Sequence, residues 1–164
     1  MRKRFEQQKK LGVLSISEVK LPLKSRDELP PILMALQYIY VTPELNEEVF
    51  RILEEKVQKG KKKTGRYGME LWHILVLSVV RLGLDADYDR LDDFANHHKL
   101  IRQILGVETT CGEGKRFSRQ SIQDNVSLLD EETIRQINEV VISSGHQIKK
   151  KKGKDCVLRW IRMR

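Results

Sequence analysis

The spacing of apolar residues after Lys24 is helical almost throughout, and it predicts an all-α fold. A first helix is predicted over residues 27–41, whose apolar side chains recur every three or four residues. Thr42-Pro43-Glu44 then supplies an N-cap, a proline at the first helical position and an acid in the first turn, so a second helix is predicted to run to about Lys59. The brief alternation over residues 13–19 has no hairpin partner and predicts no sheet.

The most apolar segment, residues 69–82, predicts the central helix of a small bundle. Its residues are apolar on nearly all sides, with Trp72 and Leu75 expected among the core contacts, and Gly83 is expected to close it. About a dozen apolar residues are too few for the roughly 20 that a bilayer span requires. The segment therefore predicts a buried helix, and we expect no membrane partner.

Two shorter helices are predicted after the central one. Residues 88–105 continue the helical period, but Asn96-His97-His98 predicts a break within them. Asp87 or Asp89 is expected to cap the first half, because an acid at a helix N-terminus satisfies free backbone amides. Gly106 is expected to end the second half.

The last third of the chain predicts a loop and two helices. Residues 109–115 are typical of a surface loop, after which Ser118 is a favourable N-cap for a short helix. Asp130-Glu131-Glu132 is expected to cap a last helix that ends at Gly145. The side chains expected on the surface of the short helix are Arg119, Gln120, Gln123 and Asn125.

Charge is unevenly distributed along the chain. The 164 residues carry a formal net charge of +8, from 31 Lys and Arg against 23 Asp and Glu. The positive charge is concentrated in residues 1–26, 59–66 and 145–164, whereas residues 27–58 hold seven acids and two bases. A basic chain with several separate cationic segments favours nucleic acid as its partner.

The same pattern divides the chain into three expected parts. They are a basic N-terminal arm over residues 1–26, a helical DNA-binding domain over residues 27–145 and a disordered basic tail over residues 146–164. Residues 5–10 are largely polar, where a secretion signal would need an apolar run after the basic start. The two cysteines lie far apart and define no disulfide framework, so the bacterial cytoplasm is the expected compartment.

Two segments are candidates for contact with DNA. The loop over residues 60–68 is basic and rich in glycine, so its cations can meet phosphates, but it lacks P-loop spacing and a solvated hinge explains it about equally well. The short helix after Ser118 has a basic lead-in and side chains that match base edges in the major groove. Together with residues 89–96 it is a candidate helix-turn-helix-like unit, and an ordinary solvent-exposed helix is the alternative. The candidate DNA-binding residues are Lys61, Lys62, Lys63, Arg66, Lys115, Arg116, Arg119, Gln120 and Gln123.

No group of residues points to catalysis, a metal site or a cofactor. His97 and His98 would diverge by about 100° on a helix, and no third ligand accompanies them. The acidic residues within 85–93 lack the glycine and the distal glutamate of a calcium loop. His73, inside the apolar helix, is expected to be a buried histidine with a hydrogen-bond partner.

With these residues in view, the chain resembles the N-terminal region of bacterial insertion-sequence transposases of the DDE type, most closely the ISNCY-type group. The resemblance covers roughly residues 1–150 and is carried by helical-core patterns, which makes it moderately specific. The matching segments are Leu21-Pro22-Leu23-Lys24-Ser25-Arg26-Asp27-Glu28-Leu29-Pro30-Pro31, Gly60-Lys61-Lys62-Lys63-Thr64-Gly65-Arg66, Leu71-Trp72-His73-Ile74-Leu75-Val76-Leu77, Tyr88-Asp89-Arg90-Leu91, Arg102-Gln103-Ile104-Leu105-Gly106 and Asp124-Asn125-Val126-Ser127-Leu128-Leu129.

The resemblance implies a function for this region. In that family the N-terminal helices are implied to bind double-stranded DNA at the terminal inverted repeats of the element, and a following RNase H-like domain holds two metal ions with Asp, Asp and Glu. No residue of this chain matches those acids, so the resemblance implies a DNA-binding fragment that is not an enzyme.

Two further expectations concern the end of the chain and its other partners. Residues 155–164 fit no helical pattern, and a frameshift is expected there, because the frame that starts at the last base of the Trp160 codon reads aspartate. The alternative function is a helical module that docks a protein partner through the acidic residues 27–58. Homo-oligomerisation stays open.

Overall fold

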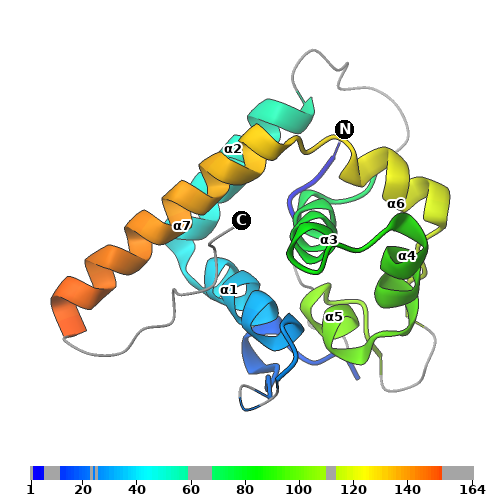
Figure 1. Cartoon of the computed structure of the whole chain (residues 1–164), viewed down its shortest axis with the longest axis horizontal. Helices are drawn as coiled ribbons and strands as arrows, with labels where there is room; N and C mark the ends of the chain where they lie inside the picture. Colours follow the sequence, from blue (N-terminus) through cyan, green and yellow to red (C-terminus); the bar gives the residue numbers. More distant parts are fainter. Residues whose placement is uncertain are drawn as a thin grey trace.

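The computed structural model describes residues 2–5, 12–22, 24, 26–58, 68–109 and 114–152, and for Gln58 and residues 145–152 it describes the backbone only. All regular structure in these ranges is helical, which confirms the predicted all-α class and small bundle (Figure 1). The helices, together with one short 3-10 turn η1 (Ile16–Glu18), are α1 (Leu29–Val41), α2 (Pro43–Gln58), α3 (Leu71–Gly83), α4 (Tyr88–His97), α5 (Lys99–Ile104), α6 (Arg119–Val126) and α7 (Glu131–Lys152).

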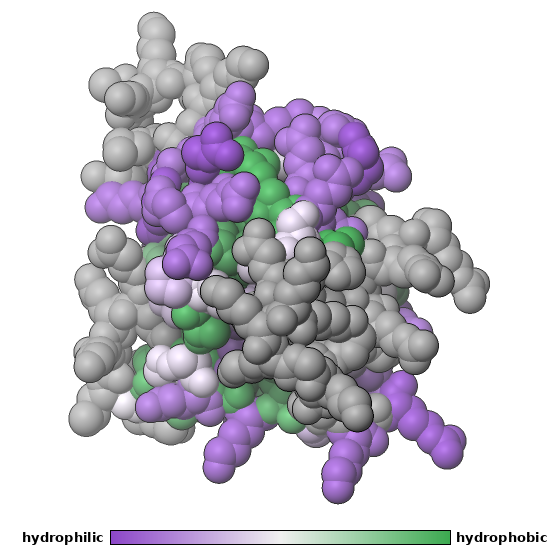
Figure 2. Space-filling model, turned by 90° about the vertical axis from the view of Figure 1, so that its left-hand side faces the viewer, coloured by the Kyte–Doolittle hydropathy of each residue, from purple (hydrophilic) through white to green (hydrophobic). Residues whose placement is uncertain are grey.

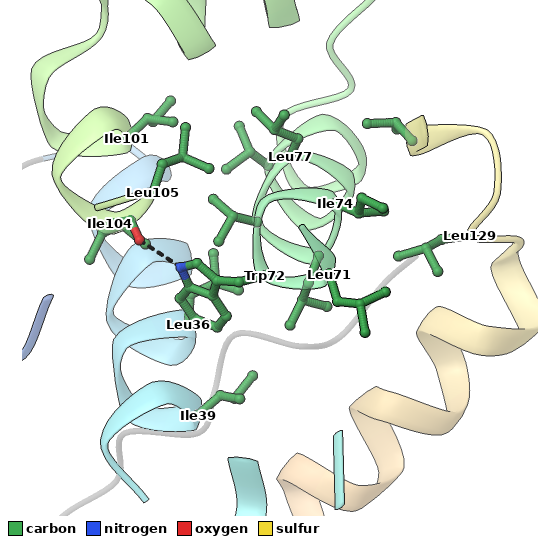
Figure 3. Close-up of a cluster of buried hydrophobic side chains, with 14 of the residues drawn as sticks. Leu36, Ile39, Leu71, Trp72, Ile74, Leu77, Ile101, Ile104, Leu105 and Leu129 are labelled. Carbon is green, nitrogen blue, oxygen red and sulfur yellow. Dashed lines mark hydrogen bonds between the residues drawn. The ribbon is translucent and has the colours of Figure 1, made fainter. Parts of the chain in front are cut away.

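Helix α3 is the centre of the bundle, as its apolar sequence predicted. Every side chain from Leu71 to Ser78 is buried, and the helix contacts α1, α2, α4 and α6. Trp72 is fully buried, and its indole Nε1 donates a hydrogen bond of 2.8 Å to the carbonyl oxygen of Ile104 (Figure 3). The bond satisfies the only polar atom of the indole and fixes the end of α5 against α3.

Helices α2 and α7 form a long pair on one side of the bundle (Figure 1). Lys56, near the end of α2, makes an ion pair with Asp130, just before α7 begins. The end of α2 therefore lies beside the start of α7, which shows that the two helices run antiparallel. Ile134, Ile137 and Val141 are buried at the three- and four-residue spacing expected for one helix face. Lys56 also lowers the pKa of the Asp130 carboxyl, followed in effect by hydrogen bonds from Thr133.

Three of the predicted caps make their hydrogen bonds in the structure. The carboxylate of Asp87 accepts a hydrogen bond from Arg90 N at 2.8 Å, the hydroxyl of Ser118 accepts one from Ser121 N at 3.2 Å, and Asp130 accepts one from Thr133 N at 3.0 Å. These bonds satisfy amides that have no partner inside their own helices.

The predicted break also occurs. His98 lies between α4 and α5 in an extended conformation, and its Nδ1 caps α5. Gly106 follows α5 with a positive φ of 68°, a conformation that glycine adopts without steric cost. Asp27 precedes α1 by two residues instead of beginning it, and its carboxylate accepts a hydrogen bond of 3.1 Å from Leu29 N.

The prediction that the last helix ends at Gly145 is wrong, because α7 continues to Lys152. One glycine inside a helix costs about 1 kcal/mol relative to alanine, which is not enough to stop it. The residues after it include four lysines, Lys149 to Lys152, and lysine is both a good helix former and favourable near the negative end of the helix dipole. The remainder of the expected tail and the proposed frameshift lie outside the described residues.

The first described residues are packed into the bundle. The carbonyl oxygen of Lys3 accepts a hydrogen bond of 3.0 Å from Leu71 N at the start of α3, and Phe5 lies 5.1 Å from the ring of His73. Arg4 makes ion pairs with Glu47 at 2.6 Å and Glu54 at 2.7 Å on α2. Residues 2–5, expected to belong to a basic arm, therefore hold α2 and α3 together.

Helices α4 and α6 are in contact, but the chain between them contains α5 and the connection over residues 105–118. A helix-turn-helix unit requires a short turn between its two helices. The helix-turn-helix-like unit therefore stays a prediction. Among the described helices, none combines the length and the apolar content that crossing a membrane would require.

Candidate nucleic-acid interface

The structure places five of the nine candidate DNA-binding residues on one continuous segment. Lys115 and Arg116 belong to the lead-in of α6, and Arg119, Gln120 and Gln123 belong to α6 itself; all five are exposed. The other four candidates, Lys61, Lys62, Lys63 and Arg66, lie outside the described residues.

Helix α6 is anchored on two sides, and one of them was not expected. Ile122 is fully buried in the core, as predicted. Asn125 was predicted on the surface, but this is wrong: its side chain is 8% exposed, and its Oδ1 accepts hydrogen bonds from Nη2 of Arg2 at 2.8 Å and from Nε at 3.2 Å. Its Nδ2 donates to Ser121 O at 2.7 Å. Asn125 is buried because Arg2, which is distant in the sequence, covers this side of the helix.

The same arginine also lies against Gly68, the first described residue after the basic loop. A Cβ atom added to Gly68 would lie 3.2 Å from Nε of Arg2, so the arginine side chain passes over Gly68 on its way to Asn125. Burial lowers the pKa of the Arg2 guanidinium. Gly68 directly follows residues 59–67, so the first described residue after the cationic segment lies beside α6.

The lead-in of α6 is fixed by Asn96 of α4. The Oδ1 atom of Asn96 accepts a hydrogen bond from Phe117 N at 2.9 Å, and its Nδ2 donates to Phe117 O at 2.9 Å. One amide side chain thus satisfies both backbone groups of a residue just before the N-cap Ser118. Asn96 therefore sets the position of α6 relative to α4.

Arg102 of α5 fixes the connection before that lead-in. Its side chain is almost fully buried, and its Nε lies 2.5 Å from the Glu108 carboxylate. Its Nη1 donates to the carbonyl oxygens of Ala95 and Lys115, each at 3.2 Å, and its Nη2 donates to Val107 O at 3.4 Å. A buried guanidinium with this many acceptors ties three segments of the chain to one point.

Gly114 is required by the same arrangement. A Cβ atom at this position would overlap both the Arg102 guanidinium and the backbone oxygen of Val107. The backbone therefore approaches the arginine as closely as only glycine permits. As a result Lys115 and Arg116 leave the connection at a fixed place and point outward, with Lys115 Nζ at 5.4 Å from the centre of the Phe117 ring.

The exposed polar side chains of α6 differ in how far they are engaged. Arg119 is paired with Asp89 of α4, with Nε at 2.8 Å from Oδ1 and Nη2 at 3.2 Å from Oδ2. Gln120 donates to Asp124 at 2.6 Å. Arg116 and Gln123 make no side-chain hydrogen bond or ion pair with any residue that the structure places. They are the residues of this segment most open to an outside partner.

His73 is buried as expected and has a hydrogen-bond partner. Its Nε2 lies 3.0 Å from Leu105 O, and the edge of its ring faces Phe117 at 5.4 Å between centres. Burial, together with the nearby charge of Lys115, lowers the pKa of His73 to about 3. The Glu70 carboxylate is 3.2 Å from Nδ1, but it is 35% exposed and does not offset the cost of burying a charged imidazole.

Two of the residues considered for metal binding serve structural roles. His98 caps α5 through Nδ1, and Asp87 caps α4. Across the placed portions of the chain, no three His, Cys, Asp or Glu side chains are grouped as a metal site would require. Comparison with known proteins gives no match: no protein-family model, no curated protein and no solved structure matches the chain.

Proposed function

We propose that the chain binds duplex DNA through α6, the basic lead-in of that helix and the cationic loop over residues 59–67. The observation that carries the proposal is the position of Arg2, which contacts both Gly68 and Asn125. It places Gly68, the first described residue after the basic loop, beside α6. Contacts of cations with phosphates position a protein on DNA, while polar side chains on a helix read the bases.

The dimensions of α6 suit the major groove. An α-helix with its side chains is about 10–12 Å across, and the major groove, about 12 Å wide, admits it. Gln123 is exposed and can donate to and accept from an adenine edge, while Arg116, exposed in the lead-in seven residues earlier, can contact a phosphate. The resemblance to transposase N-terminal regions supports element ends as the target, with this chain acting as their binding module and not as an enzyme.

The test is a titration of labelled duplex DNA at several salt concentrations. Binding through several phosphates predicts that log K falls linearly with log salt, with a slope of about 0.9 per phosphate contact. Replacing Lys61, Lys62 and Lys63 by alanine is expected to weaken all sequences alike and to reduce that slope. Gln123→Ala is expected to reduce the difference in affinity between duplexes of specific and of random sequence.

The matched control removes three positive charges from a part of the chain outside the proposed interface. Lys20, Lys24 and Arg26 are exposed and belong to the segment that precedes α1. Figure 1 shows α1 and α6 on different sides of α3. Their triple alanine variant is expected to retain most of the affinity and the salt slope. Absence of binding at low salt, or equal losses from the two triple variants, would contradict the proposal.

A second candidate function, docking of a basic protein partner on α2, has one observation in its favour. Glu44, Glu48 and Glu55 are exposed and fall on one stripe of α2. Figure 2 shows the side of the molecule on which α7 lies, where hydrophilic residues predominate among those coloured. The acids Glu47 and Glu54, however, already hold Arg4, so less of the acidic region is open than its sequence suggests. Binding of an oligolysine peptide that is lost when these three glutamates become glutamine would support this alternative over DNA binding.

A further inference from the structure

Among the residues that the structure describes, Asp89 is the one on another helix whose side chain engages a candidate DNA-binding side chain of α6. It lies in the first turn of α4, and Arg119 is the first residue of α6. The two helices are neighbours in the bundle (Figure 1). Each carboxylate oxygen of Asp89 meets a different nitrogen of the guanidinium, at 2.8 Å and 3.2 Å, which is the bidentate geometry.

This geometry occupies the part of Arg119 that DNA would use. A guanidinium presents the same fork of N–H groups to a carboxylate and to a phosphate. While Asp89 holds the fork, Arg119 does not offer it to a phosphate, a contact that duplexes of every sequence would share. The negative charge of Asp89 also remains close to any phosphate that approaches this end of α6.

The pair is nevertheless weak enough to exchange. The two side chains are 58% and 70% exposed, and ion pairs in such surroundings contribute little to stability because water and salt screen them. The contact therefore does not hold the two helices together. Anchoring of α6 instead comes from Ile122, Asn125 and the Asn96 contact with Phe117.

We propose that Asp89 is a positioning residue that withholds Arg119 from DNA and thereby limits the affinity of α6 for duplexes of any sequence. This inference rests on the proposed DNA binding. With Arg119 withheld, discrimination between sequences falls to Gln123, which has no such partner among the residues described. Asp89 thus raises sequence specificity, because it reduces the phosphate contact of Arg119, which contributes to the binding of every sequence alike.

The experiment compares Asp89→Asn with Asp93→Asn. Asp93 lies on the same helix, is exposed and makes no ion pair with any other described residue. Its Asn variant removes the same single negative charge without releasing an arginine. Asp89→Asn is expected to bind random duplex DNA about 3- to 10-fold more tightly than wild type, with a salt slope steeper by about 0.9, the value for one added phosphate contact. Asp93→Asn is expected to leave the slope unchanged.

A double variant identifies the side chain that is released. In Asp89→Asn with Arg119→Gln, both the gain in affinity and the steeper slope are expected to disappear. Thermal unfolding of each variant shows whether the fold is retained. If the role of Asp89 were purely structural, Asp89→Asn would change the melting temperature and leave the salt slope of DNA binding unchanged.

The outcomes separate this inference from the proposed function. If wild type binds DNA with a steep salt dependence but Asp89→Asn behaves like Asp93→Asn, the role of Asp89 is refuted and DNA binding stands. A gain that persists without Arg119 also refutes it. If neither wild type nor Asp89→Asn binds DNA at low salt, the proposed function falls and this inference falls with it.

Discussion

The side-chain amide of Asn96 holds both backbone groups of Phe117, accepting from its N–H and donating to its carbonyl oxygen, each at 2.9 Å. The two residues are 21 positions apart, and the contact joins α4 to the lead-in of α6. It sets where α6 begins, and so where its exposed side chains lie. The candidate interface therefore depends on a residue that would not itself contact DNA.

Replacement of Asn96 by alanine is expected to destabilise the fold by about 1–3 kcal/mol, because both backbone groups of Phe117 lose their partner. Urea unfolding followed by circular dichroism measures the change. Asn96→Asp is expected to be worse at pH 7, since a second carboxylate then lies beside Asp92, which accepts from Asn96 Nδ2 at 3.0 Å. Equal stability of Asn96→Ala and wild type would contradict this role.

Gly114→Ala is expected to destabilise the fold by about 1–3 kcal/mol, because the added Cβ meets the backbone of Val107 and the buried Arg102, which cannot easily move. Gly83→Ala is the matched control. There the added Cβ would lie 2.6 Å from Cδ1 of Ile32, the far end of a flexible side chain, and alanine also favours the helix. Thermal melts of the two variants are expected to differ by several degrees, and a larger loss in Gly83→Ala would overturn the argument.

The buried His73 predicts that acid destabilises the protein. Its pKa is about 3 in the folded state, below the ordinary value of 6.5, so the unfolded chain binds the proton first. The contribution of His73 to the free energy of unfolding is therefore fully present above about pH 6.5. It falls by about 1.4 kcal/mol per pH unit as the pH decreases toward 3. His73→Gln retains a donor for Leu105 O without this titration. Its unfolding free energy is expected to depend less steeply on pH between 6 and 4, and parallel profiles for the two proteins would refute the prediction.

Arg4 is expected to matter for stability and not for DNA. Hydrogen bonds to Glu54 and Glu47 raise the pKa of the Arg4 guanidinium above its ordinary value. Arg4→Ala is expected to lower the urea midpoint, and the difference from wild type is expected to shrink between low and high salt because part of the effect is electrostatic. Lys20→Ala, at an exposed position, serves as the control. A loss of DNA affinity without any loss of stability would instead assign Arg4 to the interface.

The helices that could be predicted from the sequence are those fixed by local chemistry. The caps Asp87, Ser118 and Asp130 each bond an amide three residues further on, so their effect is contained in a short window. The break at His98 is local in the same sense. The helix end predicted at Gly145 failed because a single glycine weakens a helix without requiring it to stop.

The candidate site could be predicted only in part, since its contacts join distant segments. Asn125 was placed on the surface because its partner, Arg2, lies 123 positions away in the sequence. Arg102 carries no sequence signal of burial beyond its position between the apolar residues Ile101 and Ile104. The engagement of Arg119 by Asp89 depends on the packing of α4 against α6, which periodicity does not determine.

The antiparallel pairing of α2 with α7 has a practical consequence. It carries the chain to Lys152 on the opposite side of the bundle from α6 (Figure 1). A fluorophore or surface tether attached within the last turn of α7 would lie far from the proposed DNA-contacting helix. Single-molecule recording on immobilised protein could then follow individual duplexes arriving and leaving without the attachment obstructing them.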